Sequence, residues 1–118
     1  LMNRIPQDLC LEGIIGSFTT QLRIGQFDLQ LTFGEIDFQI ESEIELFRNG
    51  ECIGLWYEGC FPSPEFYEIM NSDVVKYTIP DDKLLVLHLE NNIEIHMKDN
   101  SDQFESMKIT WGQKQWII

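Results

Sequence analysis

The sequence predicts an α+β fold that is mainly antiparallel β, built from two similar helix-plus-meander halves that share one core. Apolar and polar residues alternate through most of the chain, and turn-forming pairs separate the alternating runs. The pattern of residues 11–60 also returns in residues 66–118. We expect residues 1–118 to form a single domain, either an antiparallel sheet with short helices on one face or a curled half-barrel.

Three closely spaced alternating runs predict the first meander. Its strands span residues 19–25, 27–33 and 36–40. Phe27 and Phe33 fall on the apolar face of the second run. Aligning the apolar faces of the second and third runs places Phe33 opposite Ile36 and leaves Gly34-Glu35 as a two-residue turn. Glycine at the first turn position favours type II′.

An Asn-Gly pair predicts the next hairpin. Asn49-Gly50 stands between two strand-like runs, and this dipeptide is the strongest short hairpin signal. The register would place Arg48 opposite Glu51, where we expect a cross-strand ion pair.

A short helix is predicted after this hairpin, ending near residue 71. Ser63 is suited to the N-cap, Pro64 to the first helical position and Glu65 to the first turn.

The second half repeats the pattern of the first. With an offset of 55 residues, 11–25 lie over 66–80 with apolar positions matched. This suggests an internal repeat of 11–60 and 66–118, although ordinary β alternation would give the same matches. The last strands are predicted at residues 105–111 and 114–118, joined by a turn at Gly112.

The charge balance is strongly acidic. Asp and Glu number 20 against 8 Lys and Arg, which gives a formal charge of −12. Nucleic acids are held largely through Lys and Arg contacts to phosphate, so this charge argues against direct nucleic-acid binding. It would attract a basic protein partner, and it would also keep the protein soluble.

The cysteine count and hydropathy predict a cytoplasmic protein that does not enter a membrane. Three cysteines make an odd number without paired metal-type spacing, and no signal-peptide apolar run follows the first residues. The longest apolar stretches are far too short to span a bilayer. We therefore expect free thiols in a reducing compartment.

The common catalytic motifs are absent from the sequence, so we expect a protein that is not an enzyme and needs no cofactor. It has no P-loop, GxGxxG, HExxH, nucleophile elbow or paired CxxC. Among the histidines, His88 would lie opposite either Glu94 or His96, depending on the hairpin register. The second register would form a His2Glu2 surface with Glu90, of zinc-like composition. Solvated sheet histidines are commoner, and we predict no metal.

An oxygen-rich run, Asp99-Asn100-Ser101-Asp102 followed by Glu105, resembles part of a calcium loop. It lacks the glycine and ligand spacing of an EF-hand. Asx-type hydrogen bonding in a tight connection explains it better.

Partner-binding residues are predicted where carboxylates and aromatic residues cluster. The acids are either a solvated face that discourages edge pairing or a docking patch that accelerates association. The aromatic residues near Phe61 are either core or, if exposed beside the acids, an interface hot spot. The predicted partner-binding residues are Asp37, Glu41, Glu43, Glu45, Glu58, Trp56 and Tyr57.

Three stretches carry a family resemblance. They are LRIGQFDLQLTF (22–33), LLVLHLENN (84–92) and DNSDQFES (99–106), the last leading to Ile117-Ile118. With these stretches the chain resembles small bacterial proteins that include immunity proteins of contact-dependent inhibition and related polymorphic toxin systems. The resemblance implies a cytoplasmic protein that binds a cognate toxin domain and blocks its active site or substrate surface.

The acidic charge favours a basic toxin, such as a nuclease, and the resemblance implies no catalytic residues. The main alternative is a non-catalytic adaptor or self-assembling β domain. A small-molecule or metal-dependent activity is the third reading.

Overall fold

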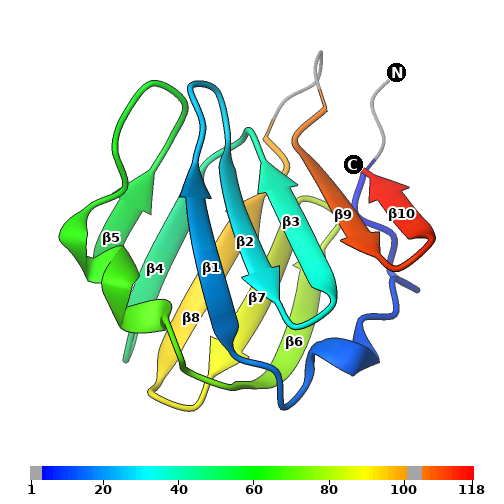
Figure 1. Cartoon of the computed structure of the whole chain (residues 1–118), viewed down its shortest axis with the longest axis horizontal. Helices are drawn as coiled ribbons and strands as arrows, with labels where there is room; N and C mark the ends of the chain where they lie inside the picture. The colour runs from blue at the N-terminus through cyan, green and yellow to red at the C-terminus, as the bar shows by residue number, and fades with distance from the viewer. Residues whose placement is uncertain (1–3, 101–104) are drawn as a thin grey trace.

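The computed structural model describes residues 4–100 and 105–118, in which ten strands form two antiparallel five-stranded sheets (Figure 1). Sheet 1 has the order β1-β2-β3-β9-β10, with β1 at Thr19–Ile24, β2 at Leu29–Phe33, β3 at Ile36–Ile40, β9 at Met107–Trp111 and β10 at Lys114–Ile117. Sheet 2 has the order β5-β4-β8-β7-β6, with β4 at Ile44–Arg48, β5 at Glu51–Trp56, β6 at Val74–Asp81, β7 at Leu84–Leu89 and β8 at Ile93–Lys98.

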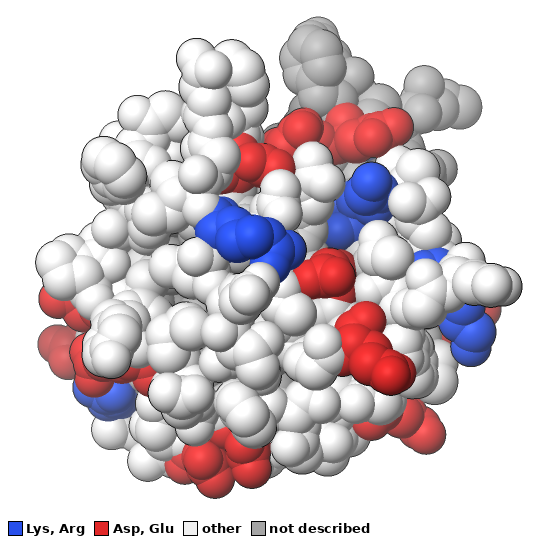
Figure 2. Space-filling model, in the orientation of Figure 1, with Lys and Arg blue, Asp and Glu red and all other residues white. Residues whose placement is uncertain are grey.

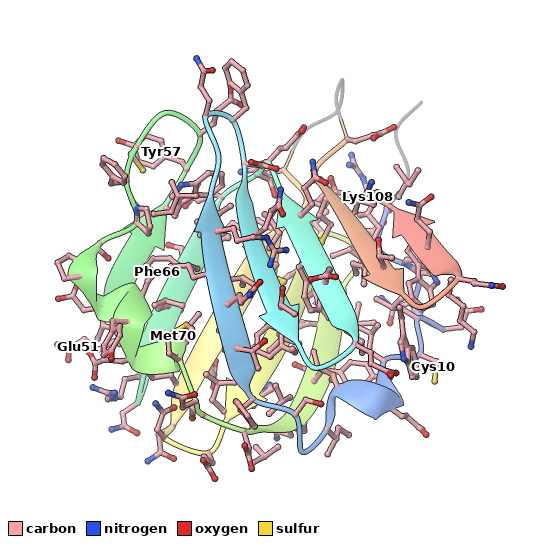
Figure 3. All side chains as sticks on the ribbon, in the orientation of Figure 1. Cys10, Glu51, Tyr57, Phe66, Met70 and Lys108 are labelled. Atoms are coloured by element: carbon pink, nitrogen blue, oxygen red, sulfur yellow. The ribbon has the colours of Figure 1, made fainter. Side chains whose placement is uncertain are left out.

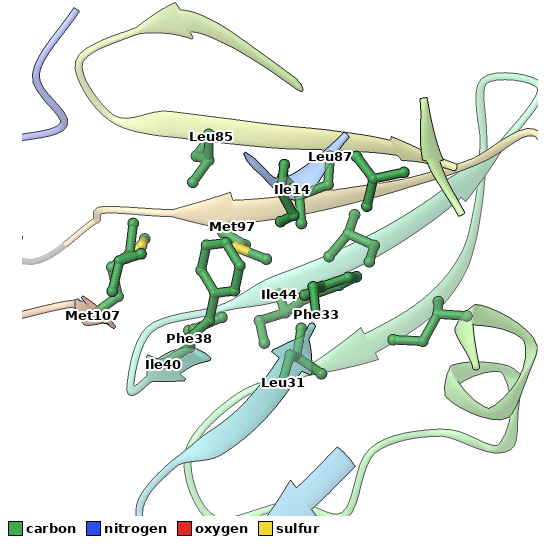
Figure 4. Packing of buried hydrophobic residues seen from close by; sticks show 14 of the residues in the cluster. Ile14, Leu31, Phe33, Phe38, Ile40, Ile44, Leu85, Leu87, Met97 and Met107 are labelled. Carbon is green, nitrogen blue, oxygen red and sulfur yellow. The ribbon is translucent and has the colours of Figure 1, made fainter. Parts of the chain in front are cut away.

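The core lies between the inner faces of the two sheets. In β2, β3 and β8 every second side chain is buried, as period-2 alternation requires. Phe33 and Phe38 of sheet 1 meet edge to face, with ring centroids 5.7 Å apart. Figure 4 shows these rings beside Ile44 and Met97 of sheet 2. The buried side chains of both sheets therefore form one cluster.

Two predicted hairpins have the predicted register. Phe33 pairs with Ile36, and Gly34 has a φ of 60°, as the first position of a type II′ turn requires. Asn49 and Gly50 have φ angles of 52° and 81°, the positive values of a type I′ turn. Both hairpin predictions are confirmed.

The ion pair predicted at the second hairpin does not form. Arg48 pairs with Glu51 in the strand register, but its guanidinium lies 2.8 Å from Glu68 instead. Glu68 belongs to the short segment that crosses the edge of sheet 2, so Arg48 links that segment to β4.

The prediction of an α+β fold is wrong, because the chain is nearly all β. Only two single 3-10 segments occur in the described residues, η1 at Glu12–Ile14 and η2 at Pro64–Ile69. Pro64 occupies the first turn of η2 as predicted, but Ser63 makes no capping hydrogen bond. Its hydroxyl lies 3.4 Å from the backbone nitrogen of Leu55 instead. Six residues give too few repeating hydrogen bonds to favour an α-helix.

The prediction of two helix-plus-meander halves is also wrong, because η1 and η2 are short 3-10 segments and each half contributes strands to both sheets. After β3 the chain passes through residues 41–43 into the other sheet, so the β4–β5 hairpin pairs with β8. After β8 it returns, and the β9–β10 hairpin pairs with β3. Both sheets thus contain strands from residues 11–60 and from residues 66–118. Alternation gives each strand its buried face but does not select its neighbour.

The N-terminal segment covers one side of the sandwich. Arg4 forms an ion pair of 3.2 Å with the buried Asp99, and the Tyr77 hydroxyl accepts a 2.9 Å hydrogen bond from the backbone of Leu11. On the opposite side, η2 and the loop before it lie beside edge strands β1 and β5 (Figure 1). No helix in the described part of the chain is long and apolar enough to cross a membrane.

Candidate functional site

A groove opens along the side where β1 and β5 form the edges of the two sheets. It consists of three adjoining hollows of about 400, 500 and 470 Å³. The first two share Ile24, and the second and third share Phe27 and Glu58. We call this surface the β1 groove, defined by Leu22, Ile24, Phe27, Glu58, Phe61 and Tyr67.

Large apolar side chains are exposed along the β1 groove. Phe61 and Tyr67 are each 79% exposed, and Ile24 and Phe27 are about half exposed. Figure 3 shows Tyr57, Phe66 and Met70 on the side of β1 that faces away from β2. An apolar surface of this kind is typical of binding sites.

The groove ends at a cluster of four carboxylates. Glu41 and Glu58 border the same hollow, with Glu105 beside them and Asp28 close to Glu41. Burial, together with the charges of Asp28, Glu58 and Glu105, raises the pKa of Glu41 above its usual value. Within the described residues, no Lys or Arg forms an ion pair with any of the four. Figure 2 shows acidic atoms near the top of the view, with basic atoms directly below them over the region of β1 and β2.

Glu43 and Glu45 lie elsewhere, on the outer face of sheet 2. The ammonium group of Lys98 lies 3.2 Å from Glu43 and 2.6 Å from Glu45. The hydrogen bond to Glu45 raises the pKa of Lys98, against the opposing effect of burial. These two acids therefore share one cation.

The other predicted partner-binding residues are distributed over the molecule. Asp37 lies on the outer face of sheet 1, 3.3 Å from the guanidinium of Arg23. Trp56 is buried in the core, whereas Tyr57 is exposed in the loop after β5. Of the predicted set, only Glu41 and Glu58 line the groove, with Tyr57 nearby in the sequence.

Sequence reasoning missed the apolar residues of the groove. Phe27 was predicted to point inward at the start of the second strand, but it lies in the β1–β2 turn with its ring exposed. Ile24 lies on the inner face of sheet 1, as period-2 alternation along β1 indicates. Its side chain is half exposed because β1 is an edge strand. The exposure of both residues depends on strand order, which periodicity does not report.

The histidines lie on the outer face of sheet 2, in the first of the two predicted registers. His88 pairs with Glu94, so the register that would place His88 opposite His96 does not form. Glu94 lies between the two rings, 2.9 Å from His96 and 3.6 Å from His88, and Thr78 lies 3.0 Å from His88. Burial lowers the pKa of His88, although Glu94 acts in the opposite direction. Among the described residues no cluster of metal ligands occurs.

The run that resembles a calcium loop is described only in part. The Asp99 carboxylate is buried and is bound by Arg4 at 3.2 Å and by the Ser106 hydroxyl at 2.6 Å. Its oxygens therefore already have partners. Ser101 and Asp102 lie outside the described residues.

Comparison with known proteins provides no match, whether to a family model, a curated protein or a solved structure. The family resemblance therefore remains a prediction, and the β1 groove is the surface from which function can be inferred.

Proposed function

We propose that this chain is a non-catalytic protein-binding domain that holds a basic surface of a partner protein in the β1 groove. The observation that supports this most strongly is the position of exposed aromatic rings directly beside carboxylates that form no ion pair among the described residues. Phe27 and Glu58 border the same two hollows, and Phe61 lines one of them. Such a surface has the apolar anchor and polar rim of an interface hot spot.

The two parts of the groove would contribute differently to binding. Burial of the exposed rings of Phe61 and Tyr67 would supply most of the affinity. The acids near Glu41 would attract a basic surface and raise the association rate, an effect that salt weakens. A chain with a formal charge of −12 would add a long-range attraction.

Neutralisation of a toxin is the biological role that we propose for this binding. A basic nuclease binds nucleic acid through Lys and Arg contacts to phosphate. The carboxylates of Glu41 and Glu58 would occupy such cations and exclude the substrate. The proposal combines this charge argument with the resemblance to immunity proteins of polymorphic toxin systems.

A self-assembling β domain is the second candidate function, favoured by the edge position of β1. Two copies would bring the same acids together at the groove, with each copy carrying a formal charge of −12. Repulsion between these charges argues against this arrangement. Sedimentation velocity would detect a stable oligomer, which would favour self-assembly.

Co-expression with the protein encoded beside it tests the proposed function. We expect the neighbouring protein to slow growth alone, and we expect this chain to restore growth and to co-purify with it. Phe61→Ala should weaken the complex, whereas Val75→Ala, at an exposed apolar residue on the distant edge strand β6, should not. A stable complex that is insensitive to Phe61→Ala would contradict the groove as its interface. A harmless neighbour that does not bind would contradict toxin neutralisation.

A further inference from the structure

The backbone of β1 has a free edge beside the groove. In antiparallel pairs, hydrogen-bonded positions alternate with positions whose backbone groups point away from the partner. The backbone nitrogen of Gly25 donates to the oxygen of Asp28, one position beyond the pair Ile24 and Leu29. By alternation, Ile24 and Leu22 direct their N–H and C=O groups away from β2.

Only part of this edge is covered by the protein itself. Near the start of β1, the oxygen of Thr19 accepts a hydrogen bond from the nitrogen of Asn71, just after η2. No such bond reaches Leu22 or Ile24 within the described residues. The uncovered edge is therefore residues 22–24, long enough to present two outward-facing residues to an added strand.

The side chains beside this edge point into the apolar part of the groove. Leu22 and Ile24 pair with Leu31 and Leu29, whose side chains are buried, so they lie on the inner side of sheet 1. The apolar hollow next to them also contains Met70. A strand added here would direct alternate side chains toward this hollow.

The charge at the end of the edge selects the type of strand. Ile24 lines the hollow that also contains Phe27 and Glu58, and the next hollow contains Glu41. These acids lack ion-pair partners among the described residues. A Lys or Arg at the matching end of an incoming strand would supply the missing cation.

We propose that an extended segment of the partner protein adds as a sixth strand to β1, with apolar side chains in the groove and a Lys or Arg beside Glu58 and Glu41. This inference rests on the proposed function and specifies the form of its partner. The backbone edge would fix the segment in an extended conformation, the apolar hollow would supply affinity, and the acids would select a basic sequence. A second copy of this chain is a weaker occupant because it carries the same acids.

The test uses the full chain and a displayed library of random nine-residue peptides. We expect selection to enrich peptides that alternate apolar residues and carry Lys or Arg at one end. A synthetic peptide of the enriched sequence should slow amide hydrogen exchange at Leu22 and Ile24. Unchanged exchange at these two amides, or no enrichment, would overturn the proposal.

Two matched variants separate backbone pairing from side-chain contact. Ile24→Pro removes the edge N–H without removing a ladder hydrogen bond, and proline is tolerated at such positions. We expect it to lower peptide affinity at least tenfold, on the order of the loss of a buried hydrogen-bonded pairing. Ile24→Val keeps the N–H and should change affinity less than about threefold. The exchange measurement on the unmodified chain remains decisive if Ile24→Pro does not fold.

The outcomes distinguish this inference from the proposed function. Peptide or partner binding that is lost in Phe61→Ala but unchanged in Ile24→Pro would overturn strand addition and leave the groove as the interface. Binding that is unchanged in both variants would overturn the groove and strand addition together. Binding reduced by both variants, and also by Glu58→Gln, is the result that we expect.

Discussion

Two acidic regions of this protein differ in how their charges are balanced. On the outer face of sheet 2, Lys98 lies between Glu43 and Glu45, within 3.2 Å of each. At the end of the β1 groove, Glu41 and Glu58 have no cation among the described residues and are bordered by exposed apolar rings. The carboxylates on sheet 2 are therefore balanced by a cation of the fold itself, whereas a partner could supply an ion pair to the carboxylates of the groove.

The comparison shows why net charge alone does not locate an interface. A formal charge of −12 describes both regions equally. Their difference depends on which side chains the sheets bring together, because β8 carries Lys98 next to β4. Each prediction below changes one of the two regions or the sheet that carries it.

The largest effect is expected for the groove aromatics. Phe61→Ala should weaken partner binding by about 2 kcal/mol, or about 30-fold in Kd, as for a central hot-spot residue. It should change the free energy of unfolding by less than about 0.5 kcal/mol because the ring is exposed. Calorimetric titration and urea unfolding measure the two quantities. If Phe61→Ala lost enough folding stability to explain its weaker binding, the result would contradict a direct contact between Phe61 and the partner.

The next largest effect is expected on the outer face of sheet 2. Lys98→Met removes the cation shared by Glu43 and Glu45 and should destabilise the fold by about 1 kcal/mol, the upper part of the range for a partly exposed ion pair. Partner binding should be unchanged. Urea unfolding provides the measurement, and restored stability in the triple variant with Glu43→Gln and Glu45→Gln would identify repulsion between the acids as the cause.

A smaller effect is expected at His88 on the same face. Burial lowers its pKa, so the folded state binds a proton less readily than the unfolded state. Neutral His88 therefore contributes stability above the pKa that it has in the unfolded state. This contribution is lost as the pH falls from that pKa toward the lower pKa of the folded state. Glu94 opposes this shift, whereas Lys76 and His96 enhance it. Thermal melts of His88→Gln across this pH range should show a smaller loss of Tm than the native chain; parallel profiles would contradict this assignment.

The smallest effect is expected at Glu41. Its pKa is raised in the folded state, so stability falls as the pH rises through the unfolded pKa to the folded one. Glu41→Gln should therefore give a slightly higher Tm at neutral pH and no gain in acid. The change should be small because solvent screens this exposed carboxylate. A lower Tm at neutral pH would show that the charge is stabilised within the fold.

Local sequence signals predicted the strands well and the sheet order poorly. Gly34 and Asn49-Gly50 determined their hairpins because the required backbone angles limit the residues at those positions. The passage of the chain from one sheet to the other, after β3 and again after β8, was not predicted. Alternation shows which face of a strand is buried but not which strands are its neighbours. The groove was missed for the same reason, since Ile24 looks like any inward strand residue.

The acids were found from the sequence, but their roles were not. Glu41 and Glu43 are separated by one residue and have similar surroundings in the sequence. The side chain of Glu41 lines the groove, whereas the side chain of Glu43 contacts Lys98 of the neighbouring strand. The spatial partner, which is distant in the chain, decides whether each charge is balanced.

The most direct test of the account compares two neutralised acid pairs. The double variant Glu41→Gln, Glu58→Gln removes charge from the groove, and Glu43→Gln, Glu45→Gln removes the same charge from the outer face of sheet 2. Stopped-flow association with the co-purified partner should slow about tenfold in the first variant, with a flatter salt dependence. The second variant should stay within about twofold of the native chain. Slower association only in the second variant would contradict the β1 groove as the binding surface and place the interface on sheet 2.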